Sequence, residues 1–174
     1  MIRSMSLASA VCLAAAQALP GAETRSATLV WDGVAAFGSA KVTNAMDARV
    51  RRPAEAGKVA MPAIFLHPLA TGRAQAEYPV VRADLAAGER LFFLGAVGLS
   101  DGFDWKDAKN TPDGVRFYVA ANGHEVLRST VTDGGWKPVA AALGEAASGG
   151  GRVELALTLA DDAGPGGSAS YDWA

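Results

Sequence analysis

Three tryptophans lie in or beside loops rich in glycine and aspartate, where a core tryptophan is less expected, and three aspartates lie near them. The set comprises Trp105, Trp136, Trp173, Asp101, Asp104 and Asp172. An indole ring offers a flat apolar face and a carboxylate accepts hydrogen bonds, so the set suits a ligand that carries hydroxyl groups on an apolar ring. We therefore expect a shallow binding site built from residues 100–113, residues 132–138 and the C-terminal segment. The structural alternative is that each tryptophan closes an end of the fold.

Three further polar residues invite a functional interpretation. His67 stands at the end of an apolar run and would donate a hydrogen bond to a ligand hydroxyl; its alternative is a structural, hydrogen-bonded histidine. Asp161 and Asp162, with neighbouring loop carbonyls, would supply part of the six to eight oxygen ligands of a structural calcium ion. The alternative for these two aspartates is a turn in which they bond their own backbone. No cofactor is expected otherwise.

Support for catalysis is weak. The chain has no H-E-x-x-H, no C-x-x-C and no phosphate-binding loop. Hydrolysis of a glycosidic bond needs two carboxylates that face each other across it, and Asp104 and Asp107 qualify by residue type only. We predict a protein that is not an enzyme.

The elements that would position these residues are strands. Residues 115–119 alternate apolar and polar side chains, and Asn122-Gly123 follows, a pair that tolerates the positive φ of a tight hairpin turn. A two-residue turn would set Val126 opposite Val119, whereas a bulged turn would set Leu127 opposite Phe117; the sequence leaves both registers open.

Other segments repeat the strand pattern. Residues 152–159 alternate strictly, residues 77–85 contain Pro79 and therefore suit an edge or a bulge, and residues 90–99 are apolar on both faces, as in a central strand. Residues 28–34 suit a strand or a short helix, and residues 140–147 suit a helical turn. Strand-like runs separated by turn residues predict an all-β sandwich.

Length, charge and the N-terminal segment limit the classes of function. A chain of 174 residues suits one domain, and a net charge of −2 without charge runs argues against a nucleic-acid partner. Residues 1–22 are typical of a secretory signal peptide, with Arg3 before an apolar run too short to span a membrane. The alternative is a buried N-terminal helix. Cys12, the single cysteine, lies in this segment, so residues 23–174 would form a secreted domain without a disulfide.

Several of these segments together resemble a known family. The order VGLSDG, DGVRFYVAANGHEVLRSTV, WKPV and GRVELALTLADDAGPGGSASYDWA, over about residues 59–174, resembles the NPCBM-type putative carbohydrate-binding modules. The resemblance implies a galactose-binding-like jelly roll, that is, a two-sheet antiparallel β-sandwich, with sugar-binding loops at one end. Members of that family continue beyond the Asp-Trp-Ala segment, so the resemblance also implies a C-terminally truncated module, with an appended catalytic domain as a partner absent from this chain.

The functional expectation follows from the strands, the loop tryptophans and the resemblance. It is a non-catalytic module of a secreted protein, extracellular or periplasmic, that binds a glycan or polysaccharide through Trp105, Trp136, Trp173, Asp101, Asp104, Asp172 and His67. The alternative is a structural or protein-interaction β-sandwich at the cell surface without a sugar site.

Overall fold

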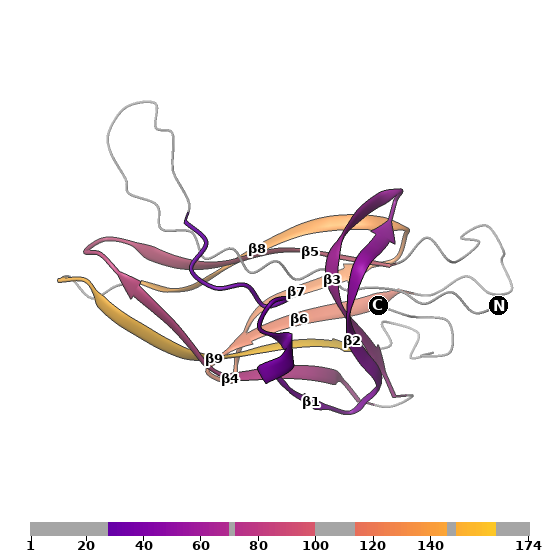
Figure 1. Ribbon diagram of the computed structural model, residues 1–174, viewed down its shortest axis with the longest axis horizontal. Helices are drawn as coiled ribbons and strands as arrows, with labels where there is room; N and C mark the ends of the chain where they lie inside the picture. Colours follow the sequence, from indigo (N-terminus) through magenta and orange to yellow (C-terminus); the bar gives the residue numbers. More distant parts are fainter. Residues whose placement is uncertain (1–27, 70–71, 100–113, 146–148, 163–174) are drawn as a thin grey trace, which may run out of the picture.

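The computed structural model describes residues 28–69, 72–99, 114–145 and 149–162. Apart from one short 3₁₀ turn, every regular element in these ranges is a strand, and all strand pairs are antiparallel (Figure 1). The prediction of an all-β protein built from antiparallel sheets is therefore confirmed. The expected signal peptide lies outside the described residues.

Nine strands follow the 3₁₀ turn η1 (Phe37–Ser39). They are β1 (Lys41–Thr43), β2 (Ala45–Ala56), β3 (Val59–Pro68), β4 (Ala74–Leu85), β5 (Arg90–Leu99), β6 (Val115–Ala121), β7 (His124–Val131), β8 (Gly135–Glu145) and β9 (Gly151–Asp162).

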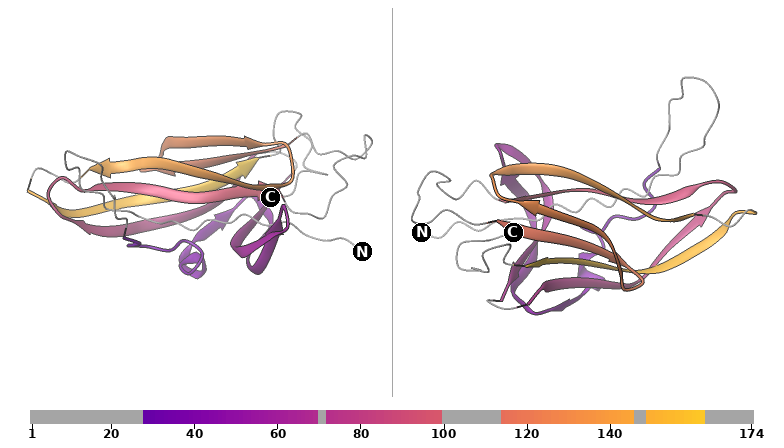
Figure 2. Two further views of the ribbon diagram at one scale, coloured as in Figure 1. Left: turned by 90° about the horizontal axis from the view of Figure 1, so that it is seen from above. Right: turned by 180° about the vertical axis from the view of Figure 1, so that it is seen from behind.

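The strands form one large sheet and two ribbons. The large sheet has the order β1-β4-β9-β6-β7, and the ribbons are the pairs β2-β3 and β5-β8. Figure 2 shows β2-β3 on one side of the molecule and β6-β7 on the opposite side. All three units contribute to one hydrophobic core, so the arrangement is that of a sandwich.

The core is built from the inward-facing members of each alternating strand. On β9, Leu155, Leu157 and Leu159 are buried, whereas Arg152 and Glu154 are exposed, as the alternation predicts. On β4 the register against β9 shifts between Tyr78 and Val81. This irregularity spans Pro79, so of the two alternatives predicted for this proline, an edge or a bulge, the structure has the bulge.

The β6–β7 hairpin turns where expected but in neither of the two registers considered. Asn122 and Gly123 have φ values of 50° and 78°, the signature of a tight turn whose two central residues are left-handed. The register then shifts at a bulge between Val119 and Ala120, and this bulge sets Leu127 opposite Val119. Turn and bulge therefore occur together, where the sequence suggested one or the other.

Two predictions about individual segments were wrong. Residues 90–99 form β5, but among the described strands it hydrogen-bonds only with β8 and is therefore not central in a sheet. Residues 140–145 belong to β8 and form no helical turn, because they pair with residues 90–94 of β5. The partner strand supplies the backbone hydrogen bonds that an alanine-rich segment would otherwise find in a helix.

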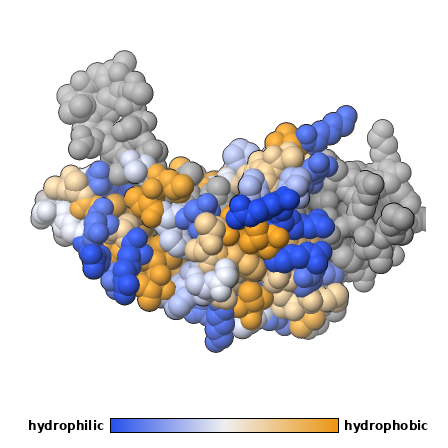
Figure 3. Space-filling model, in the orientation of Figure 1, coloured by the Kyte–Doolittle hydropathy of each residue, from blue (hydrophilic) through white to orange (hydrophobic). Residues whose placement is uncertain are grey.

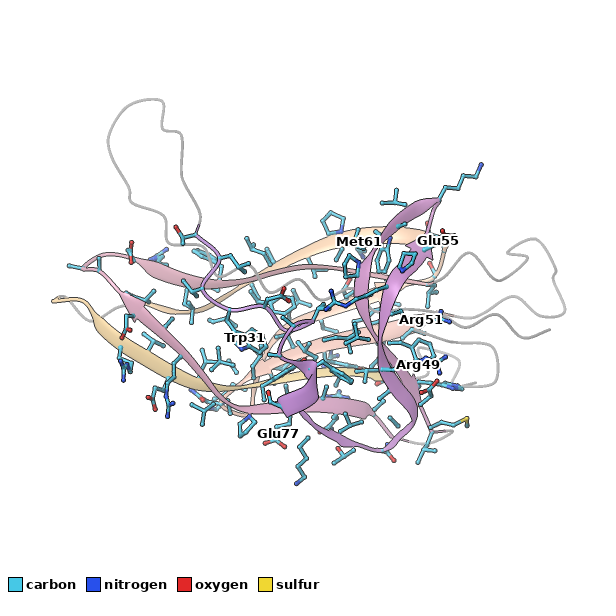
Figure 4. All side chains as sticks on the ribbon, in the orientation of Figure 1. Trp31, Arg49, Arg51, Glu55, Met61 and Glu77 are labelled. Carbon is cyan, nitrogen blue, oxygen red and sulfur yellow. The ribbon has the colours of Figure 1, made fainter. Side chains whose placement is uncertain are left out.

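Residues 28–34 form neither a strand nor an α-helix. The Asp32 carboxylate accepts hydrogen bonds from the backbone N–H groups of Val34 and Ala35, at 2.8 and 3.1 Å. The Trp31 ring, labelled in Figure 4, packs edge to face against the Tyr78 ring, and the two ring centroids lie 4.7 Å apart. This segment therefore packs against the core through aromatic contacts instead of strand pairing.

A basic pair lies along β2, on the face shown in Figures 3 and 4, where hydrophilic side chains border hydrophobic ones. The guanidinium carbons of Arg49 and Arg51 lie 5.4 and 5.5 Å from the centroid of the Phe65 ring. Asp47 forms an ion pair with Arg49 at 3.0 Å. The pair therefore covers a buried aromatic ring, in addition to lining a solvated face.

Candidate functional site

Most of the residues predicted to bind a ligand lie outside the described residues. These are Trp105, Asp101, Asp104, Asp172 and Trp173. Trp136 and His67 are described.

Trp136 lies on β8 and is held by structural contacts. Its indole N–H donates a hydrogen bond of 2.8 Å to the Val59 carbonyl oxygen. The ring packs against a small cluster formed by Ala54, Ala63 and Met61. It is half-buried, and it is one of the residues 130–138 that line an open hollow of about 430 Å³. Trp136 thus joins the β2-β3 ribbon to β8, and only part of the ring is left for a ligand.

Close packing around Trp136 gives a testable consequence. A β-carbon added at Gly98 would lie 2.6 Å from the Gly135 carbonyl oxygen and 2.8 Å from Cε3 of Trp136. We expect Gly98→Ala to lower the free energy of unfolding by about 1–3 kcal/mol, because β8 must shift. Chemical denaturation monitored by tryptophan fluorescence measures it. Gly144→Ala on β8, where an added β-carbon meets nothing within 4 Å, is the control. Equal losses in both variants would contradict the packing assigned to Trp136.

His67 lies on β3 and is buried, with 4% of its surface exposed. Its ring is tilted against that of Phe65, 6.4 Å away between centroids. It does not line the hollow beside Trp136. Of the predicted binding residues, the two that are described are therefore not brought together.

A second hollow, of about 230 Å³, lies on the outer face of the large sheet. Strands β4, β9, β6 and β7 contribute to it, and the right-hand view of Figure 2 has β6 and β7 in front. Small side chains and a glycine line it together with polar and aromatic ones. The lining residues are Arg73, Gln75, Tyr118, Ala120, Gly123, Glu125, Thr158 and Ala160. We call it the Tyr118 hollow.

Tyr118 is the centre of an ordered polar cluster. Its ring lies 3.6 Å from the guanidinium carbon of Arg73 and 5.3 Å from that of Arg128. Its hydroxyl donates a hydrogen bond of 2.6 Å to the Asp162 carboxylate. Burial, followed by this hydrogen bond, raises the pKa of Tyr118 above its usual value, so the phenol stays protonated at neutral pH and keeps donating.

The carboxylates of the cluster are held by arginines. Glu125 accepts two hydrogen bonds from Arg128, at 2.9 and 3.1 Å, and Asp162 accepts one from Arg116 at 2.8 Å. The hydrogen bond to Asp162 is the main cause that raises the pKa of Arg116. Charge-assisted pairs of this kind fix side-chain orientation, so the hollow is bordered by preorganised donors and acceptors.

Asp161 differs sharply from its neighbour. Its side chain is fully buried, and neither carboxylate oxygen has a hydrogen-bond partner among the residues that the structure describes. Burial, followed by repulsion from Asp162, raises the pKa of Asp161 well above its usual value. Consecutive strand residues point to opposite faces, and Asp162 bonds to Arg116 and Tyr118 on the outer one. The two carboxylates therefore do not converge on one calcium ion, and both residues belong to β9, so neither the calcium site nor the turn considered for this pair is found. Within the described ranges, no group of three or more His, Cys, Asp or Glu side chains is arranged to hold a metal.

The Tyr118 hollow was missed by sequence reasoning. Arg116 and Tyr118 were placed on the polar face of their strand, which is correct, but nothing in the sequence links them to Arg73 or Asp162. The available signal is an aromatic residue on the polar face of a strand. A tyrosine placed there is partly removed from water only when neighbouring strands supply covering side chains.

The fold and the hollow define an all-β sandwich protein with a polar, aromatic depression on one sheet. No protein-family model, curated protein or solved structure matches this chain. Among the described residues, no helix has the length and apolar character needed to cross a membrane.

Proposed function

We propose that this chain is a non-catalytic carbohydrate-binding module of a secreted protein, as its resemblance to the NPCBM-type modules implies. The Tyr118 hollow is the observation that carries the proposal. Small side chains of Ala120 and Ala160 lie beside polar groups of Gln75, Thr158 and Glu125. A sugar ring presents C–H groups and hydroxyls side by side, and this lining complements both.

Size and charge arrangement favour recognition over turnover. A hollow of about 230 Å³ is smaller than the roughly 300–1,000 Å³ typical of sites for drug-sized ligands, so it suits one sugar unit of a longer chain. The carboxylates of Glu125 and Asp162 are engaged by arginines instead of facing each other across a cleft. An appended catalytic domain would then supply any hydrolysis, and this module would hold the polymer.

Blocking the hollow tests the proposal. The full chain is screened against a glycan array and insoluble polysaccharides, with an expected single-site affinity in the micromolar to millimolar range. We expect Thr158→Phe to weaken binding to the best ligand at least tenfold, because the new ring occupies the hollow. Isothermal titration measures the affinity, and the melting temperature verifies that the variant is folded.

A matched substitution in the other hollow locates the site. Thr132 lines the hollow beside Trp136 and is exposed, so Thr132→Phe should leave affinity unchanged. Loss of binding in Thr132→Phe, with Thr158→Phe unaffected, would move the site to Trp136. If the folded chain binds no glycan at all, the alternative of a structural or protein-interaction module replaces the proposal.

A further inference from the structure

Arg73 differs from the other arginines of the Tyr118 cluster in what it contacts. Its ion pairs with Glu125 and Asp162 are long, at 3.9 and 3.7 Å, beyond hydrogen-bonding distance. Within the described part of the chain, its guanidinium N–H groups form no hydrogen bond. The group is nevertheless held in place, because its guanidinium carbon lies 3.6 Å from the centre of the Tyr118 ring.

The neighbouring carboxylates are already engaged by other donors. Arg128 binds both oxygens of Glu125, and Arg116 and the Tyr118 hydroxyl bind the two oxygens of Asp162. Among the described residues, the cluster thus contains three guanidinium groups and two carboxylates, which gives it a net charge of +1. That charge borders the hollow, because Arg73 is one of its lining residues.

We propose that the Tyr118 hollow selects acidic sugars, with the carboxylate of a hexuronate unit bound by the N–H groups of Arg73. This inference rests on the function proposed above and names its substrate class. The planar fork of a guanidinium matches the two oxygens of a carboxylate, and such pairs are roughly twice as strong as neutral hydrogen bonds. Gln75 and Thr158 then lie beside the hydroxyls of the same unit.

Preorganisation supports this assignment. An exposed arginine ordinarily loses side-chain freedom when it binds an anion, and that loss reduces affinity. Arg73 is 41% exposed yet already lies over an aromatic ring, so less freedom remains to be lost. The tyrosine therefore acts as a platform that presents the arginine, and the ring itself is mostly covered.

The test compares an acidic oligosaccharide with its neutral derivative. Oligogalacturonate and its fully methyl-esterified form share one backbone and differ in the charge that Arg73 would bind. We expect the wild-type chain to bind the acid at least tenfold more tightly than the ester, with a preference that declines as salt is added. Arg73→Gln should abolish the preference, and Arg73→Lys should restore only part of it, because lysine lacks the fork.

A control arginine and a free anion complete the design. Arg82 lies on β4, the strand that begins directly after Arg73, and it pairs with Glu154 at 2.7 Å. It does not line the hollow, so Arg82→Gln should bind like wild type. Equal binding of acid and ester by the wild-type chain would overturn the inference and leave carbohydrate binding intact. Binding of neither form, nor of any glycan on the array, would overturn both. Acetate that competes as strongly as the oligosaccharide, per carboxylate, would show anion binding without sugar recognition and would also overturn it.

Discussion

Replacing Phe117 with alanine is expected to lower the free energy of unfolding by about 3–5 kcal/mol. The ring is 2% exposed and belongs to the core shared by the large sheet and both ribbons. Its removal leaves a cavity that surrounding strands fill only in part, because each is fixed by its own ladder. Urea denaturation followed by circular dichroism measures the loss.

The control for this prediction is a large-to-small substitution at the surface. Val80 is 51% exposed on β4, so Val80→Ala should change the unfolding free energy by less than about 0.5 kcal/mol. A denaturation midpoint of Phe117→Ala that equals that of the wild type would refute the placement of this ring in the core.

Asp161→Asn is expected to stabilise the protein at neutral pH, by about 1.4 kcal/mol for each pH unit over which the wild-type carboxyl must take up a proton on folding. The folded chain raises the pKa of this carboxyl, so it holds the proton more tightly than the unfolded chain does. Unfolding free energy in the wild type must therefore fall as the pH rises above the unfolded value of about 3.9 and continue to fall until the folded pKa is passed. The asparagine side chain does not ionise, so this contribution to the pH dependence of the unfolding free energy is absent in the variant.

The measurement is unfolding free energy as a function of pH. The difference between Asp161→Asn and wild type should be small in acid and should grow as the pH rises. Asp84→Asn is the control, because this carboxylate is exposed and pairs with Arg152 at 3.0 Å. Parallel curves for Asp161→Asn and wild type would show that the carboxyl is not buried in solution.

Local patterns predicted the strands because each reflects which side chains face the core. The leucines of β9 and the turn at Asn122-Gly123 are read directly from spacing and residue type. The alanine-rich part of β8 was misread because its strand state depends on pairing with β5, a partner distant in the sequence. Propensity is a weak guide wherever a tertiary partner supplies the hydrogen bonds.

The Tyr118 hollow could not be predicted from local sequence patterns, because its residues come from strands that are distant in the sequence. Tyr118, Arg73 and Asp162 meet because β9 lies between β4 and β6, an order that does not follow the chain. Alternation does place Asp161 on the same face as Leu157 and Leu159, so its burial follows from the pattern. Its residue type, however, suggested a turn, and the pattern proved the better guide.

The position of β9 also bears on how the protein is made. The ladders of β9 with β4 and with β6 are the two that unite the large sheet, yet β9 is the last strand of the described chain to leave the ribosome. Until then β4 and β6 both expose unpaired edges, and such edges invite association between nascent chains. The large sheet can therefore form completely only late in synthesis, once its central strand β9 has been made.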